Sequence, residues 1–133
     1  MEHTLSNGAV VELRDRSTLT ERLARPVSVA QTRSVPVSQK LLSAGFNEED
    51  ATTWGPMYDL SPDEWDRLWA YKTAVIAAMV VKWPWPLDIS EEGAGNVHPD
   101  VFEELASVCN LAFRGESFEI DPDPKVDTSA STD

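Results

Sequence analysis

The chain has 133 residues and a formal net charge of −12, from 11 basic and 23 acidic side chains. This length suits one domain, and a hydrophobic content of 41% is enough for a core. The negative balance argues against nucleic acid and anionic membranes as partners, because binding to either needs clustered Lys and Arg. The single cysteine, Cys109, excludes an internal disulfide and favours a reducing, cytoplasmic setting. Residues 1–8 lack the basic start and apolar run of a signal peptide.

The charge is divided unevenly along the chain. Residues 1–40 hold six basic and four acidic side chains, a net charge of +2, whereas residues 41–133 hold five and nineteen, a net charge of −14. The simpler interpretation is a basic head that packs near an acidic body of the same molecule. The alternative is that one of these segments meets an oppositely charged surface on a partner.

Residues 1–16 are expected to form a β-hairpin. Asn7-Gly8 is a strong turn dipeptide, and it lies between Thr4-Leu5 and the run from Ala9 to Leu13. Two short strands are marginal on their own. The hairpin must therefore pack on a helix or pair with the edge of another chain.

The next segment is expected to be helical from Ser17 or Thr18, where Thr18 and Glu21 have the spacing of a capping box. Pro26 removes a backbone donor and crowds the preceding turn, so the sequence predicts two short helical pieces. From residue 35 to 59 the pattern weakens to a short helix ending near Gly45 and a loop. An irregular loop of this length is unusual in a compact domain unless it contacts something.

The clearest pattern predicts a central helix over residues 61–83. Ser61 is the expected N-cap, Pro62 stands at the first helical position, and Glu64 completes a capping box. Apolar spacing predicts one buried face, formed by Trp65, Leu68, Trp69, Lys72, Val75, Ile76, Met79, Val80 and Trp83. A membrane span needs roughly 20 apolar residues, and residues 73–81 give only nine without a charge. This segment is therefore expected to be a core helix.

The sequence WPWP at residues 83–86 ends the central helix, because each proline disfavours helical backbone at the residue before it. Trp83 continues the apolar face and is expected in the core. Trp85 has two open interpretations: structural packing over the helix end, or a partly exposed anchor for a partner. Trp54 and Met57, in the preceding loop, are further candidates for partner binding.

A third helix is predicted over residues 98–114, opened by Pro99 and Asp100 and followed by Gly115. Cys109 lies on its apolar side without a basic neighbour, so the thiol is expected to be buried and inert. Residues 119–133 are acidic and rich in Pro, Ser and Thr, which predicts a disordered tail. The expected fold is mainly α, with residues 17–118 forming a small helical domain after the hairpin.

The sequence offers no catalytic or phosphate-binding motif. His98, Asp100, Glu103 and Glu104 could suggest a metal cluster. However, the two glutamates point in different directions on a helix, and no second histidine is near. His98 is better interpreted as a helix cap. We therefore expect a binding protein rather than an enzyme, without cofactor or metal.

Four features together resemble the tail assembly chaperones of long-tailed, siphovirus-like phages, especially those of actinobacterial hosts. They are the turn and strand leading to VELRDRSTLTERLARPV, the helix LWAYKTAVIAAMVVKWPWPLD, the HPDVFEELA helix and the tail motif IDPDPK. The resemblance spans residues 10–125, and the segment 35–59 matches no feature of that family.

The resemblance implies a small, acidic, mostly helical protein that coats the tape measure protein in the host bacterial cytoplasm while the tail tube polymerises. It also implies absence from the finished virion, and many such proteins occur in two forms through a programmed ribosomal frameshift. The tail tube protein and a second copy of the chain are further candidate partners. Two other classes stay open: a head–tail connector or minor tail protein of the virion, and a small host regulatory binding protein.

Overall fold

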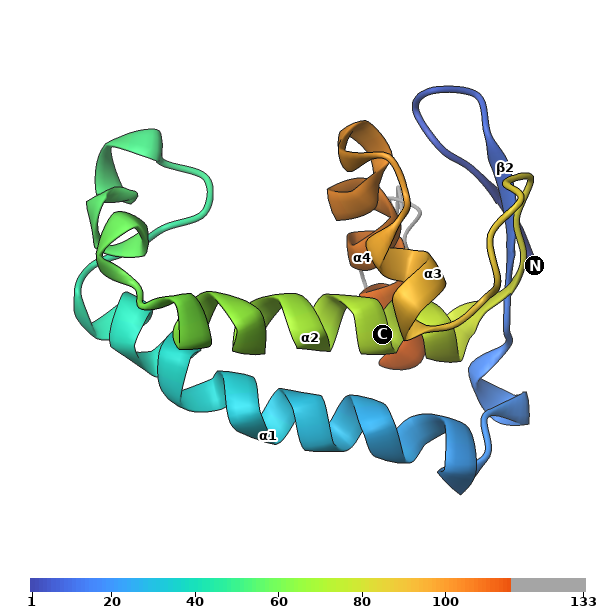
Figure 1. The fold of residues 1–133 in the computed structure, drawn as a ribbon, viewed down its shortest axis with the longest axis horizontal. Coiled ribbons are helices and arrows are strands. Elements are labelled where there is room, and N and C mark those ends of the chain that lie inside the picture. Colours follow the sequence, from blue (N-terminus) through green and yellow to red (C-terminus); the bar gives the residue numbers. More distant parts are fainter. Residues whose placement is uncertain (116–133) are drawn as a thin grey trace, which may run out of the picture.

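The computed structural model describes residues 1–115, and the tail predicted at 119–133 lies outside the described residues. The fold is mainly helical, as the sequence predicts. Its helices are α1 (Glu21–Ser43), α2 (Pro62–Met79), α3 (Glu91–Gly95) and α4 (Pro99–Phe113). Its strands are β1 (Glu2–Thr4), β2 (Val10–Leu13) and β3 (Val80–Lys82). Figure 1 shows α1 and α2 side by side and antiparallel, with α3, α4 and the sheet gathered towards the C-terminal end of α2.

The predicted hairpin is present. β1 and β2 pair antiparallel, with His3 opposite Val11. The turn is closed by a hydrogen bond of 2.9 Å from the Gly8 amide to the Leu5 carbonyl. Gly8 has a φ of 90°, which glycine adopts without a steric cost. Leu5, Val11 and Leu13 are buried in the same core as the helices, so the hairpin packs on helices as expected.

The prediction of two short helices around Pro26 is wrong, because α1 is one continuous helix that contains both Pro26 and Pro36. Both prolines are exposed. The buried positions of α1 recur every three or four residues and face α2; they are Val27, Ala30, Ser34, Val37 and Leu41. Full burial of a Val or Leu side chain contributes about 1.5–3 kcal/mol, while a proline inside a helix costs about 3 kcal/mol. The combined burial of these five side chains therefore offsets the free-energy cost of the two prolines.

The start of α1 also differs from the prediction. The N-cap is Thr20, whose side chain accepts a hydrogen bond from the Leu23 amide, and not Thr18. Thr18 instead belongs to a short 3₁₀ turn, Arg16–Thr18, which Asp15 caps. The predicted helix end near Gly45 is confirmed, since α1 stops at Ser43.

The central helix begins as predicted and ends earlier. Its capping box between Ser61 and Glu64 is present, but α2 stops at Met79 and residues Val80–Lys82 form β3. β3 pairs antiparallel with the free edge of β2, which gives a sheet of order β1-β2-β3. Arg14 stabilises this switch: its amide donates to the Met79 carbonyl at 2.6 Å and its Nε to the Ala78 carbonyl at 3.0 Å. Such partners satisfy carbonyls that a helix end leaves open.

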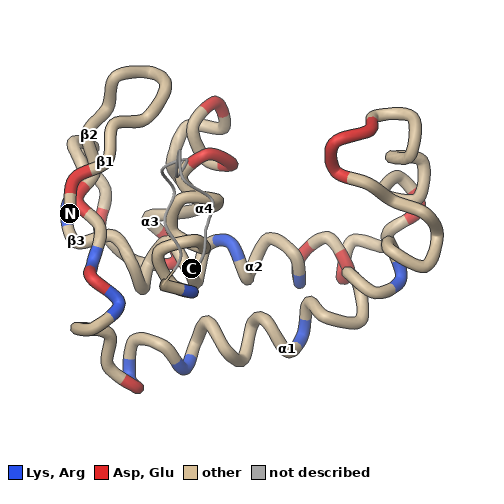
Figure 2. Tube along the Cα trace, turned by 180° about the vertical axis from the view of Figure 1, so that it is seen from behind, with Lys and Arg blue, Asp and Glu red and all other residues tan. Residues whose placement is uncertain are grey.

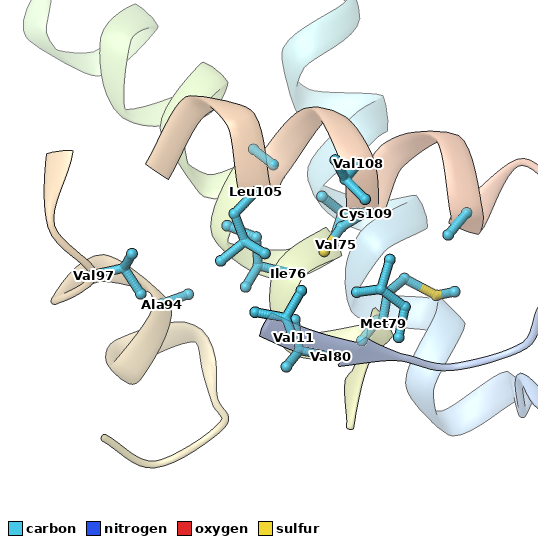
Figure 3. Close-up of a cluster of buried hydrophobic side chains, with 14 of the residues drawn as sticks. Val11, Val75, Ile76, Met79, Val80, Ala94, Val97, Leu105, Val108 and Cys109 are labelled. Carbon is cyan, nitrogen blue, oxygen red and sulfur yellow. The ribbon is translucent and has the colours of Figure 1, made fainter. Parts of the chain in front are cut away.

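The main core lies between the second half of α2, α4 and the sheet. Figure 3 shows Val75, Ile76 and Met79 of α2 near Leu105 and Cys109 of α4. The third helix is confirmed at Pro99–Phe113, with His98 as its N-cap through a hydrogen bond from the Asp100 amide to Nδ1. Among the described helices, none combines the length and the apolar character that crossing a membrane requires.

Candidate partner-binding groove

The first half of α2 is less covered than its apolar pattern predicts. Trp65 is 42% exposed and Trp69 is 49% exposed, and Leu68 is only partly buried. The predicted buried face is therefore correct from Val75 onward and wrong for these two tryptophans. The physical reason is that the elements forming the main core gather around the C-terminal half of the helix (Figure 1).

A groove of about 730 Å³ runs over this exposed stretch, and we call it the aromatic groove. Residues of α1 and the first half of α2 form its floor, the segment 44–60 forms one wall, and α4 forms the other. In both Figure 1 and Figure 2, the segment 44–60 and α4 rise from the same side of α2 at separate points along it. The large apolar and aromatic lining residues are Val35, Leu41, Phe46, Trp54, Met57, Tyr58, Trp65, Leu68, Trp69 and Tyr71.

The wall at 44–60 is an ordered structure, although no regular pattern marks it in the sequence. It contains two 3₁₀ turns, Ala51–Thr53 and Gly55–Asp59. The Trp54 indole Nε1 donates a 3.1 Å hydrogen bond to the Asn47 carbonyl. A second apolar cluster ties the wall to α1 and α2; its members are Val37, Leu41, Leu60, Phe46, Met57 and Leu68. The expectation that this long segment makes contacts is thus confirmed within the chain.

The opposite wall contacts the floor through aromatic and polar pairs. The rings of Trp69 and Phe102 are stacked, with centroids 6.4 Å apart and an interplanar angle of 22°. The Trp69 ring also lies against Gly95 of α3, where an added Cβ would come within 2.8 Å of it. The Lys72 ammonium forms an ion pair of 2.6 Å with Glu103. The contacts with Phe102 and Gly95 hold the Trp69 ring in place, while 49% of this residue stays exposed.

Two further groups complete the geometry of the floor. The Tyr71 hydroxyl donates a hydrogen bond to Asn110 of α4, and burial raises the pKa of this phenol. At the start of α2, the Glu64 carboxylate accepts from the Ser61 amide and from Lys40 of α1. These two interactions, the Ser61 amide first, lower the pKa of Glu64. These interactions attach α2 to α1 at one end of the floor and to α4 further along.

The four partner-binding residues predicted from the sequence lie in two separate parts of the structure. Trp54 and Met57 line the aromatic groove. Trp83 lies in the main core at 8% exposure, as predicted, and its indole donates to the Leu87 carbonyl at 2.8 Å. Trp85 is partly buried, and its ring centroid lies 5.4 Å from that of Trp83. This contact favours the packing interpretation of Trp85, while its role towards a partner stays a prediction.

Sequence reasoning missed Trp65, Trp69 and Tyr58 as surface residues. Tyr58 is 80% exposed, and all three line the aromatic groove. A signal was available: residues 45–59 contain no second amphipathic helix that could cover the first turns of the central helix. An apolar stripe longer than its predicted cover indicates an exposed docking surface.

The His, Cys and acidic side chains singled out in the sequence lie in separate environments. Residues 1–115 contain no group of three His, Cys, Asp or Glu side chains arranged to hold a metal ion. Glu103 and Glu104 point apart, towards Lys72 and Ser6 respectively. Cys109 is fully buried, and burial raises the pKa of its thiol.

Comparison with protein-family models, curated proteins and solved structures finds no match for this chain.

Proposed function

We propose that this protein is a phage tail assembly chaperone that holds an apolar helical segment of the tape measure protein in its aromatic groove. The observation that carries the proposal is the accessibility of three tryptophans within one groove. Trp54, Trp65 and Trp69 are 38%, 42% and 49% exposed. Contiguous exposed apolar surface of this kind marks interaction sites, because water contact with it is unfavourable.

The shape of the site suits a helix as client. The groove has an apolar floor along α2 and walls on two sides, which is the arrangement of helix-in-groove recognition. A tape measure protein is long, helical and in part strongly apolar, and its segments need cover before the tail tube encloses them. Tryptophan is the residue type most enriched among interface hot spots, where truncation to alanine costs about 2 kcal/mol or more.

The overall charge supports the same role. A net charge of −12 on 133 residues makes coated particles repel one another. An apolar groove on a strongly charged body therefore covers the client and keeps the complex in solution. The resemblance of residues 10–125 to tail assembly chaperones supports the choice of client.

The test is co-expression with the tape measure protein encoded in the same gene cluster, followed by measurement of the soluble client fraction. We expect wild type to keep the client soluble and a Trp65→Ala, Trp69→Ala double variant to lose most of this effect. Leu42→Ser is the matched control, because Leu42 is 68% exposed and lies outside the groove lining. The melting temperature of each variant separates loss of binding from loss of fold.

Two results would contradict the proposal. One is an insoluble client with the wild-type protein. The other is recovery of the protein from purified virions at a fixed copy number, which would favour the virion-component alternative.

A further inference from the structure

One side of α1 carries exposed arginines, and Figure 2 shows basic positions spaced along this helix. Arg22, Arg25 and Arg33 are exposed. Together with Pro26 and Val29 they recur at the spacing that brings side chains to one side of a helix. All five line a groove of about 610 Å³ that also includes residues of α2 and α3. We call this surface the arginine face.

The arginine face holds more positive than negative charge. Its groove is lined by the three arginines and by two acidic residues, Glu21 and Glu91. Glu21 forms an ion pair of 2.9 Å with Arg25. Within residues 1–115, neither Arg22 nor Arg33 forms an ion pair. The face therefore offers two guanidinium groups that the described acidic residues leave without a salt bridge.

The sequence that follows α4 carries the opposite charge. Residues 116–133, which we call the acidic segment, contain six acidic side chains and one lysine, a net charge of −5. Three of the acidic residues, Glu119, Asp121 and Asp123, lie within five positions of one another. By contrast, α1 holds four basic side chains and one acidic side chain, a net charge of +3. The two segments are therefore complementary in charge.

The acidic segment leaves the described fold close to the start of α1. Gly115, the last described residue, lies against the Arg16 side chain, because a Cβ added to Gly115 would come within 3.0 Å of the Arg16 Cδ. The Arg16 guanidinium also donates a hydrogen bond to the Phe113 carbonyl. Arg16 precedes the first residue of the arginine face by only six positions.

From this arrangement we infer that the arginine face is a docking surface for the acidic segment of the same chain. Arg22 and Arg33 are the principal anchors, and the carboxylates of Glu119, Asp121 and Asp123 are their partners. The inference concerns a different surface from the aromatic groove and does not depend on the proposed function.

The length of the acidic segment and its covalent attachment favour docking within one molecule. From Arg22 to Arg33 the helix axis advances about 16 Å at 1.5 Å per residue. Eighteen residues can extend to roughly 60 Å, so the segment reaches the whole face. An exposed ion pair is weak on its own. A short tether, however, raises the effective concentration of a ligand to the millimolar range, about 1 mM or more.

Docking at the arginine face leaves the aromatic groove open. Gln31, Val35 and Ser38 of α1 line the aromatic groove. With 3.6 residues per turn, these three residues lie on the opposite side of the buried stripe of α1 from the arginines. A client in the aromatic groove and the acidic segment on the arginine face can therefore be bound at the same time.

Two other occupants fit the arginine face less well. Nucleic acid would meet the arginines but also a molecule with a net charge of −12, which repels a polyanion. The acidic segment of a second copy carries the right charges but lacks the tether, so its effective concentration is only that of the protein in solution.

The test places a nitroxide label on the full-length chain at Ser129→Cys. The native Cys109 is fully buried, so the introduced thiol is the reactive one. At low salt we expect the label to broaden the amide signals of Arg22, Val29 and Arg33 and to remove most of their intensity. At about 1 M salt the intensity should return, because the screening length falls to about 3 Å.

Variants of α1 locate the effect. Arg22→Gln with Arg33→Gln should restore most of the signal intensity along α1 at low salt. Arg67→Gln with Lys82→Gln is the matched control, because it removes the same charge from α2 and β3 and should leave the broadening unchanged. All four side chains are exposed, so the melting temperature should stay close to that of wild type.

A variant of the acidic segment tests the other partner without touching α1. Neutralisation by Glu119→Gln, Asp121→Asn and Asp123→Asn together should also restore the signals of the arginine face. A broadening that survives both sets of variants would overturn the inference, and so would the absence of broadening at low salt.

Two further outcomes would overturn the inference by identifying another arrangement. Broadening of the Trp54, Trp65 and Trp69 indole signals in place of α1 would mean that the acidic segment enters the aromatic groove. The second outcome comes from a mixture of nitrogen-15 chains without a label and labelled chains without nitrogen-15. Broadening of equal strength in this mixture would mean that the segment docks on a second copy.

Discussion

Trp83 and Trp85, which follow β3, differ in how deeply they are buried. Trp83 has 8% of its surface exposed and hydrogen-bonds its indole to the Leu87 carbonyl. Trp85, two residues later, lies partly buried against the Trp83 ring. Pro84 and Pro86 disfavour helical backbone at the residues before them, and the chain bends over residues 84–87.

Trp83→Ala should therefore lower the free energy of unfolding by about 3–5 kcal/mol, the usual cost of emptying a buried aromatic site. Trp85→Ala should cost clearly less, because its ring is only partly buried. Urea denaturation followed by circular dichroism measures both. Trp83→Phe is the control that keeps an apolar ring, and it should retain much of the stability. An equal loss for the two alanine variants would show that both rings belong to the core.

At the scale of elements, the start of α2 depends on a charged carboxylate. The folded-state pKa of Glu64 lies below its ordinary value of 4.5, first because the Ser61 amide donates to it and then because of Lys40. A group with a lowered pKa contributes stability above its unfolded-state pKa, and that contribution is lost as pH falls through the folded-state pKa.

Glu64→Gln should consequently have a lower melting temperature than wild type at neutral pH. The difference in melting temperature should disappear as the pH falls past the pKa of Glu64. Thermal melts between pH 7 and pH 3 measure this. A difference in melting temperature that stays constant across this pH range would mean that the charge of Glu64 contributes nothing to stability.

The prolines of α1 give a second prediction about an element. Pro26 and Pro36 are both exposed and both inside a helix whose buried stripe faces α2. Replacing either with alanine restores a backbone donor and leaves the stripe intact. Each change should stabilise the protein by about 2 kcal/mol, given a proline cost near 3 kcal/mol and some loss of rigidity in the unfolded chain. Chemical denaturation is the measurement, and a loss of stability would show that α1 needs the prolines for its shape.

The same elements show what sequence can and cannot predict. The capping box at Ser61 and Glu64 and the boundaries of α4 rest on neighbouring residues, so local rules found them. The continuity of α1 through Pro26 depends on packing against α2, and β3 depends on the free edge of β2. Both are tertiary effects that override local propensity. The local sequence pattern alone therefore predicts neither the continuity of α1 nor the strand β3.

On the scale of the whole molecule, the aromatic groove was only half predictable. The sequence indicates Trp54 and Met57 as candidates, and both line the groove. The spacing of Trp65 and Trp69 predicts a buried face, but both side chains are exposed. Whether such a face is covered depends on where other elements pack. Here the wall at 44–60 and α4 stand apart along α2, and the stripe between them stays accessible (Figure 1).

We propose that a client helix enters this groove, and the five tryptophans of the chain allow a direct measurement of this binding. Each indole N–H gives its own signal in a nitrogen–proton correlation spectrum. The probe is the helical segment of the tape measure protein with the longest apolar stripe, titrated into the labelled full-length chain. We predict saturable shifts of the Trp54, Trp65 and Trp69 indole signals, with Trp83 unchanged. Shifts confined to Trp83 and Trp85, or no shifts at all, would contradict the account.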